Sequence, residues 1–175
     1  PPKGNSKIII DKLPLNIIEI GFINRFFPNS KYIFVNRHPC DSVLSCFLTN
    51  FQINEAMVHF LDIKDTLNLY NEVFKLWNSY IKNLNIKFHT IKYEDIVLNF
   101  DRTISSLISF LSLDWEDKLR DYSKTALNRV KINTPSYNQV TQPLHTDSIA
   151  RWIKFKNIVK VENELHDWIN YFKYN

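Results

Sequence analysis

The sequence has 175 residues, of which 45% are hydrophobic, 14% aromatic and 23% charged, and its formal net charge is +4. This composition argues against global disorder and predicts one domain, spanning residues 1–175, with a sizeable core. The chain holds two glycines and contains neither G-x-x-x-x-G-K-[ST] nor G-x-G-x-x-G. A P-loop NTPase and a dinucleotide-binding Rossmann domain are therefore disfavoured, because their backbones need glycine to approach phosphates.

In the first part of the chain, residues 7–10 (KIII) form a short apolar run that predicts a buried strand. Residues 15–27 repeat apolar side chains at helical spacing and are followed by Pro-Asn-Ser at 28–30, which ends a helix. Residues 31–36 (KYIFVN) predict a second strand. Strand, helix and strand in this order indicate a βαβ unit, and hence a parallel pair with a right-handed crossover.

The next predicted element is a helix from Pro39 to about residue 50, followed by a longer helix over about residues 54–84 with a clear apolar stripe. Residues 87–92 (KFHTIK) predict a third strand, and residues 101–111, 116–127 and 159–172 predict three further helices. The stretch 128–146 is polar and reads as a long ordered loop. We therefore expect an α/β fold with a small parallel sheet flanked by helices on both faces.

Several classes of partner are not expected. No apolar run approaches the ~18 residues that a membrane-spanning helix needs. Cys40 and Cys46 lie in one predicted helix at a spacing that suits neither a disulfide framework nor a metal site, and the histidines are scattered, so we expect free thiols and no metal. The aromatic residues follow apolar stripes and do not alternate with Lys or Arg, which disfavours nucleic acid.

Polar clusters follow each predicted strand, at residues 11–12 (DK), 37–38 (RH) and 93–95 (YED). Ligands of open parallel sheets bind beyond the carboxyl ends of the strands, so the three clusters predict a site there. Arg37 offers a planar fork of donors suited to phosphate. Ser45 lies two turns into the following helix, where its hydroxyl could reach the same phosphate. The basic excess of the chain suits such an anionic ligand.

Five ordered motifs extend this interpretation: DKLPLN at residue 11, IGFINRFFPNSKYIFVNRHPCDSVLS at residue 20, YEDIV at residue 93, FLSLDW at residue 110 and SYNQVTQPLHTDSIARW at residue 136. In this order they resemble the PAPS-dependent sulfotransferases, where PAPS is 3′-phosphoadenosine-5′-phosphosulfate. The likeness is greatest to bacterial proteins with tetratricopeptide repeats fused to a sulfotransferase domain and to tyrosylprotein sulfotransferases. It covers nearly the whole chain and implies a sulfotransferase fold related to that of the P-loop NTPases.

The resemblance implies roles for particular residues. Arg37 and Ser45 would bind the 3′-phosphate of PAPS, and Tyr93 would contact its adenosine part. Lys12 would contact the transferring sulfuryl group and the leaving oxygen, and would be the catalytic residue. Arg151 would reach the nucleotide from the C-terminal region.

Ser136 would approach the phosphosulfate end of the cofactor by the same resemblance. His38 stands where the family often has an acidic residue, and it receives no role. The implied reaction moves a sulfuryl group from PAPS to a hydroxyl acceptor, which could be a protein tyrosine, a glycan or a small molecule, and leaves PAP. Catalysis would then consist mainly of positioning and of cationic stabilisation of the leaving group, with a general base for the acceptor proton.

In the family, a first strand and a loop containing Gly and Ser/Thr hold the 5′-phosphosulfate, and they lie upstream of the DK motif. We therefore expect this chain to be a C-terminal portion that lacks this strand and loop, and that lacks the catalytic glutamate of the tyrosylprotein branch. A non-catalytic sulfotransferase-like binding module is the alternative, and a nucleotide kinase would need a P-loop upstream. No targeting segment is visible, so we expect a cytoplasmic location, with the Golgi lumen as the alternative for a eukaryotic source.

Overall fold

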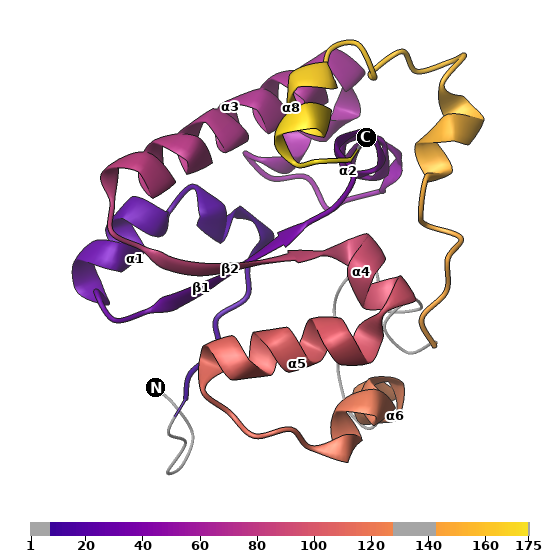
Figure 1. Cartoon of the computed structure of the whole chain (residues 1–175). Coiled ribbons are helices and arrows are strands. Elements are labelled where there is room, and N and C mark those ends of the chain that lie inside the picture. Colours follow the sequence, from indigo (N-terminus) through magenta and orange to yellow (C-terminus); the bar gives the residue numbers. More distant parts are fainter. Residues whose placement is uncertain (1–7, 128–142, 175) are drawn as a thin grey trace.

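The computed structural model describes residues 8–127 and 143–174 (Figure 1). Within these ranges, β1 (Lys31–Asn36) and β2 (Lys87–Lys92) form a two-stranded parallel sheet, paired from Lys31 with Lys87 to Asn36 with Lys92. Both strands have the bounds that the sequence predicts. The connection between them carries α2 (Pro39–Leu48), η2 (Met57–Leu61) and α3 (Ile63–Asn83), the long crossover that a parallel pair requires.

The strand predicted at residues 7–10 is wrong for the described part of that range. Residues 8–10 have no regular structure, and the side chains of Ile8, Ile9 and Ile10 are 53%, 72% and 79% exposed. An apolar run forms a strand only where a neighbouring strand pairs with its backbone, and among the described residues β1 pairs with β2 instead. The parallel pair is therefore formed by β1 and β2, and the described residues of the range 7–36 do not form the expected βαβ unit.

Helices cover both faces of the sheet, as expected (Figure 1). Phe34 of β1 stacks on Trp77 of α3, with ring centroids 4.7 Å apart. On the opposite face, His89 of β2 stacks on Phe110 of α5 (Phe100–Leu111), with centroids 5.3 Å apart. Alternate side chains of a strand point to opposite faces, so this short sheet is held between α3 and α5.

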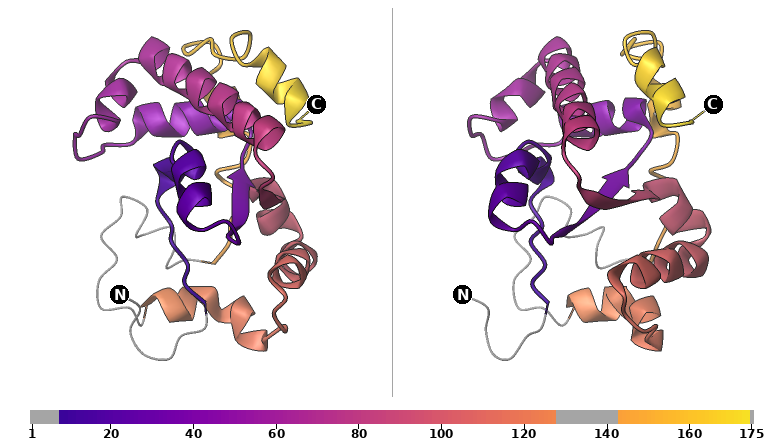
Figure 2. Two further views of the ribbon diagram at one scale, coloured as in Figure 1. Left: turned by 90° about the vertical axis from the view of Figure 1, so that its left-hand side faces the viewer. Right: turned by 60° about the vertical axis from the view of Figure 1, so that its left-hand side comes forward.

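The main core lies between α2, α3 and the C-terminal segment, by which we mean residues 143–174. This segment includes η4 (Arg151–Phe155) and α8 (His166–Tyr171), and Figure 2 shows α8 beside α3. Trp168 donates its indole N–H to Asn71 Oδ1 at 2.7 Å. The buried cluster consists of Cys40, Val43, Leu67, Val161, Leu165 and Ile169. The C-terminal segment is therefore an integral part of the fold.

Other element boundaries differ from the sequence predictions. The helix expected over residues 15–27 is divided into η1 (Pro14–Ile17) and α1 (Ile20–Phe26). The helix α3 begins at residue 63, later than the predicted residue 54, because the Asp62 side chain accepts hydrogen bonds from the N–H groups of Lys64 and Asp65 and so caps the helix there.

The polar residues after β2 belong to a helix, α4 (Tyr93–Leu98). The helix expected over 116–127 is η3 (Asp117–Asp121) followed by α6 (Tyr122–Leu127). The final helix expected over 159–172 is helical only in its second half, as α8. None of the helices within the described residues is both long and apolar enough to cross a bilayer.

Leu165 provides a test of the role of the C-terminal segment in the core. Its side chain is fully buried in the main cluster. Leu165→Ala removes this packing and leaves a cavity, so we expect a loss of about 2–5 kcal/mol in the free energy of unfolding, measured by urea titration. The control is Ile158→Ala in the same segment, where the side chain is 79% exposed, and it should cost less than about 0.5 kcal/mol. Equal losses in the two variants would contradict this packing.

Candidate functional site

The two faces of α2 have different neighbours. Cys40 and Val43 point into the main core. Asp41, Ser45 and Leu48, spaced at i, i+4 and i+7, share the other face and line a pocket of about 70 Å³. The spacing of core and pocket residues along one helix therefore places a polar surface directly beside the packed interior.

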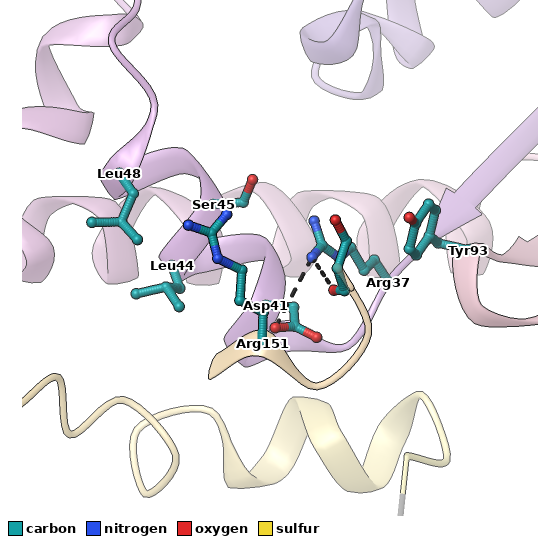
Figure 3. Close-up of a pocket in the computed structure, with 8 residues that line it drawn as sticks. Arg37, Asp41, Leu44, Ser45, Leu48, Tyr93 and Arg151 are labelled. Carbon is teal, nitrogen blue, oxygen red and sulfur yellow. Dashed lines mark hydrogen bonds and ion pairs between the residues drawn. The ribbon is translucent and has the colours of Figure 1, made fainter. Parts of the chain in front are cut away.

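Arg37 lies in the turn between β1 and α2 and is the centre of this pocket (Figure 3). Its Nη2 donates to the carbonyl of Ser148 at 2.5 Å and lies 4.0 Å from Asp41 Oδ1. Its guanidinium also lies over the ring of Tyr93, 5.2 Å from the centroid. These contacts hold the side chain in one orientation while part of its fork of donors remains available.

Four residues that the sequence assigns to a cofactor-binding site line this one pocket: Arg37, Ser45, Tyr93 and Arg151. They come from the β1–α2 turn, from α2, from the start of α4 and from η4, so tertiary structure alone brings them together. The pocket holds the guanidinium groups of Arg37 and Arg151 against the one carboxylate of Asp41, which leaves a positive balance suited to an oxyanion.

An unsatisfied donor supports this interpretation. Arg37 Nε is buried and has no hydrogen-bond partner among the described residues. A buried donor without a partner is costly, and a bound phosphate or sulfate oxygen would remove that cost. The volume of the pocket is enough for a few water molecules or for one phosphate-sized group, and too small for a whole nucleotide. The residues present therefore fit one phosphate-sized anionic group.

The other two predicted site residues are not in this pocket. Lys12 is exposed on the extended segment before η1 and is not among the residues that line the pocket. Because residues 8–10 form no strand, the DK cluster does not follow a sheet strand as Arg37 and Tyr93 do. Ser136 lies outside the described residues.

Sequence reasoning missed two polar residues of the pocket, Asp41 and Ser148, besides the apolar Leu44 and Leu48. Asp41 is buried at 1% exposure, and its Oδ1 accepts a hydrogen bond from the Trp152 N–H at 2.8 Å. Ser148 contributes its carbonyl to Arg37, a contact that no sequence pattern signals, because 111 residues separate the two. Asp41 does lie midway between Arg37 and Ser45, four residues from each, and this spacing was the one available signal.

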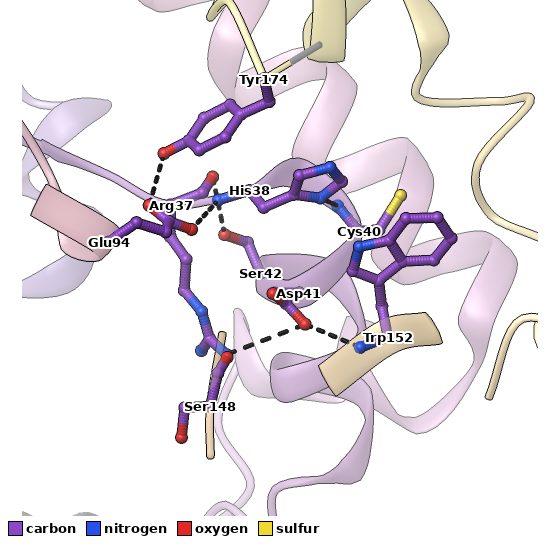
Figure 4. A network of polar contacts seen from close by, with 9 residues as sticks. All are labelled: Arg37, His38, Cys40, Asp41, Ser42, Glu94, Ser148, Trp152 and Tyr174. Carbon is purple, nitrogen blue, oxygen red and sulfur yellow. Dashed lines mark hydrogen bonds and ion pairs between the residues drawn. The ribbon is translucent and has the colours of Figure 1, made fainter. Parts of the chain in front are cut away.

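His38 connects the turn after β1 with the C-terminal segment (Figure 4). Its backbone N–H donates to Glu94 Oε1 at 2.9 Å, and its Nδ1 accepts from the Cys40 N–H at 3.2 Å. Burial lowers the pKa of the imidazole, and the nearby carboxylates of Asp41, Glu94 and Glu162 offset this in part. A neutral ring is also what the Nδ1 acceptor requires, so the geometry and the direction of the pKa shift agree.

The two cysteines are free, as expected. Burial is the main cause that raises the pKa of Cys40 to about 12 and that of Cys46 to about 11. Both side chains are therefore thiols at neutral pH and poor nucleophiles. Within the described residues, no group of three or more His, Cys, Asp or Glu side chains is arranged to hold a metal ion.

A second cavity adjoins the first across Leu48, which lines both. It is a groove of about 380 Å³ between the end of α2 and η2, with walls formed largely by apolar side chains such as Phe51, Met57 and Phe60. Phe51 and Phe60 lie with ring centroids 5.3 Å apart. The candidate site is thus a small cationic pocket with a larger apolar groove beside it.

Comparison with known proteins finds distant relatives, two of which are named protein-tyrosine sulfotransferases. Protein-tyrosine sulfotransferase 2 of Gallus gallus is 22% identical over 163 residues, which are 85% of this chain and 41% of that protein. Protein-tyrosine sulfotransferase A of Caenorhabditis elegans is 20% identical over 153 residues, 83% of this chain and 38% of that protein. An uncharacterized protein of Aquifex aeolicus (strain VF5) is 26% identical over 149 residues, 85% of this chain and 19% of that protein.

The chain thus spans less than half the length of these curated relatives. A sequence model of the sulfotransferase family matches residues 1–117, which contain β1, α2, β2 and three of the four predicted residues that line the pocket. The match covers more than half of the chain, but not the C-terminal segment that supplies Ser148 and Arg151 to the pocket. The chain therefore belongs to the sulfotransferase family.

Proposed function

We propose that this chain is part of a PAPS-dependent sulfotransferase, and that the pocket around Arg37 binds the 3′-phosphate of the nucleotide. The observation that carries the proposal is the meeting of Arg37, Ser45, Tyr93 and Arg151 in one pocket, although up to 114 residues separate them in sequence. Family membership and the unpartnered Arg37 Nε support it. In this proposal, residues 1–175 belong to a single sulfotransferase domain.

Each pocket residue has a physical task in this proposal. Arg37 pairs with the 3′-phosphate through its free donors, while the Ser148 carbonyl and the Tyr93 ring keep its orientation. Ser45 donates its hydroxyl from the same face of α2, and Arg151 adds a second positive charge from the C-terminal segment. Tyr93 stands beside Arg37 and contacts the adenosine part. Ser136 completes the contacts near the phosphosulfate end.

When bound, PAPS supplies an activated sulfuryl group, and PAP is the product that leaves. Lys12 stabilises the negative charge that develops on the leaving oxygen and can donate a proton to it. A base takes the proton of the acceptor hydroxyl as the new oxygen–sulfur bond forms. Because Lys12 is not among the residues that line the pocket, its task requires that the bound nucleotide extend beyond the pocket.

The acceptor is a hydroxyl-bearing molecule in this proposal. Relatives named protein-tyrosine sulfotransferases favour a protein tyrosine over a glycan or a small molecule. The groove beside Leu48 is apolar and lined by Phe51 and Phe60, which suits the ring of a phenolic acceptor. A cytoplasmic or a Golgi-lumenal location fits the site equally, because the pocket residues depend on neither disulfides nor a compartment.

A second candidate is a sulfotransferase-like module that binds the nucleotide or a protein without turnover. The exposed position of Lys12, away from the pocket, is the observation that favours it. Both candidates predict nucleotide binding at Arg37, and they differ only in whether Lys12 affects a reaction.

The first test concerns Arg37. In the full-length polypeptide that contains this chain, we expect PAP to bind more tightly than AMP, because only PAP carries the 3′-phosphate. Arg37→Ala should remove that difference, at a cost of about 1.5–3 kcal/mol or roughly 10- to 150-fold in affinity, measured by titration calorimetry. Arg102→Ala, at an exposed position on α5, is the matched control. Equally weak binding of PAP and AMP by the unmodified protein would refute the proposed function.

The second test concerns Lys12. Formation of PAP from PAPS is measured in the full-length polypeptide with peptidyl-tyrosine, sugar and phenolic acceptors. If Lys12 stabilises the leaving oxygen, Lys12→Ala should lower kcat by about 10²- to 10³-fold while the affinity for PAP changes little. Lys64→Ala, at an exposed position on α3, should leave both unchanged. Normal kcat in Lys12→Ala would show that this residue is not catalytic, and PAP binding without PAP formation would favour the non-catalytic module.

A further inference from the structure

His38 has no role in the proposed reaction, yet it lies where the pocket meets the C-terminal segment. Its backbone N–H is held by Glu94 at 2.9 Å, and its Nδ1 is held by the Cys40 N–H at 3.2 Å. The first contact ties the residue to α4, and the second ties the ring to the start of α2. The imidazole is therefore fixed in orientation before any contact with the C-terminal segment is considered.

The face of this fixed ring stacks on Trp152. The ring centroids are 5.3 Å apart and the planes are inclined by 15°. Trp152 is also held through its backbone, because its N–H donates to Asp41 Oδ1 at 2.8 Å (Figure 4). Residues at the start of α2 thus contact Trp152 in two ways, by stacking on its indole and by accepting a hydrogen bond from its backbone N–H.

The neighbour of Trp152 in sequence is Arg151, which lines the pocket with Arg37. The residue before it, Ala150, has φ 54° in the left-handed region, an unfavourable conformation for a side chain with a Cβ. Such a conformation persists where surrounding contacts impose it. The two contacts of Trp152 with His38 and Asp41 are of this kind, and they fix the backbone position of the adjacent Arg151.

Tyr174 also packs against the imidazole of His38. Its ring meets His38 edge to face at 5.2 Å, and its hydroxyl donates to Glu94 Oε2 at 2.9 Å. Lys92 Nζ lies over the same tyrosine ring, 4.1 Å from the centroid. His38 is therefore enclosed by α2, by Trp152 and by the end of the chain, and this burial is what disfavours its charged form.

We propose that His38 is a positioning residue, whose ring holds Trp152 against the start of α2 and so places Arg151 at the phosphate pocket. The role rests on the proposed function in one respect, namely that Arg151 contacts the nucleotide. An imidazole suits the task because it combines a flat face for the indole with an in-plane acceptor for the Cys40 N–H. No smaller polar side chain and no aromatic hydrocarbon offers both.

Two substitutions separate these contacts. His38→Asn retains a side-chain oxygen that can cap α2, but it removes the ring that meets Trp152. His38→Phe retains a ring for the indole but removes the acceptor. If the stack positions Arg151, the full-length polypeptide with His38→Asn should bind PAP about three- to tenfold more weakly, and AMP as before. His38→Phe should remain within about twofold of the unmodified protein.

A double-mutant cycle shows whether His38 acts through Arg151. Arg151→Ala alone should weaken PAP binding by about tenfold or more. In that background, His38→Asn should cause no further loss beyond about twofold, because the side chain that it positions is gone. The positioning role would be overturned if His38→Asn lowered PAP affinity as much in the Arg151→Ala background as in the unmodified protein. Equal losses of PAP affinity in His38→Asn and His38→Phe would also overturn it. In either case, a preference of the unmodified protein for PAP over AMP would leave the proposed function intact.

A measurement without nucleotide tests the held ring itself. The neutral form of His38 is favoured on folding, so its stabilising contribution is fully present above the unfolded pKa of about 6.5 and is lost as the pH falls through the lower folded value. The charged groups that act on the ring are Arg37, Asp41, Glu94 and Glu162, and the titratable side chain of Tyr174 packs against it.

The free energy of unfolding, measured by urea titration between about pH 5 and about pH 8, should therefore fall more steeply below about pH 6.5 in the unmodified protein than in His38→Asn. His59→Asn, at an exposed position, should leave the slope unchanged. Parallel slopes in the unmodified protein and His38→Asn would show that the ring is not held in the neutral form by the Cys40 N–H, and would overturn the geometry on which the proposal depends.

Discussion

The parallel pairing of β1 with β2 is the constraint on which the rest of the site depends. Parallel strands in register end at the same edge of a sheet, so the turn after β1 and the start of α4 after β2 meet there. Arg37 follows one strand and Tyr93 the other, and their side chains lie 5.2 Å apart in a cation–π contact. Each of the two residues directly follows its strand, so the register of the strands brings their backbones together.

A single carboxylate fixes this edge further. Glu94 accepts the backbone N–H of His38 with one oxygen and the hydroxyl of Tyr174 with the other. It therefore connects the turn after β1, the helix α4 and the end of the chain. An isolated two-stranded sheet is marginally stable in water, so contacts of this kind, together with the packing of α3 and α5, are what make the short sheet a rigid base for the pocket.

Asp41 shows how stability and binding share the same residues. Its carboxylate is buried next to Arg37, and its Oδ1 accepts a hydrogen bond from the Trp152 N–H of the C-terminal segment. Its Oδ2 has no hydrogen-bond partner among the described residues. A buried carboxylate is tolerated where positive charge and hydrogen bonds oppose its desolvation. Asp41 thus limits the positive charge of the pocket and at the same time attaches the segment that supplies Arg151.

Elements with strong local signals could be predicted from the sequence. Both strands of the sheet and the helix after Arg37 were predictable, because apolar runs, Pro39 and helical spacing act over a few residues. The motif pattern around Arg37, Ser45 and Tyr93 also sufficed to predict the family, which the comparisons confirm. The expected strand at residues 7–10 failed for the opposite reason: whether an apolar run pairs depends on a neighbour that no local pattern reveals.

The full set of residues that share the pocket depends on contacts between distant parts of the chain. Ser148 and Trp152 reach Arg37 and Asp41 across 111 residues, and their contacts use a backbone carbonyl and a backbone N–H, groups that every residue except proline carries in full. His38 could not be given a role from sequence, because its partners come from α2, α4, η4 and the end of the chain. Hydrogen bonds to the main chain and ring stacking leave no sequence signature, so this part of the site emerges only when the C-terminal segment packs against α2.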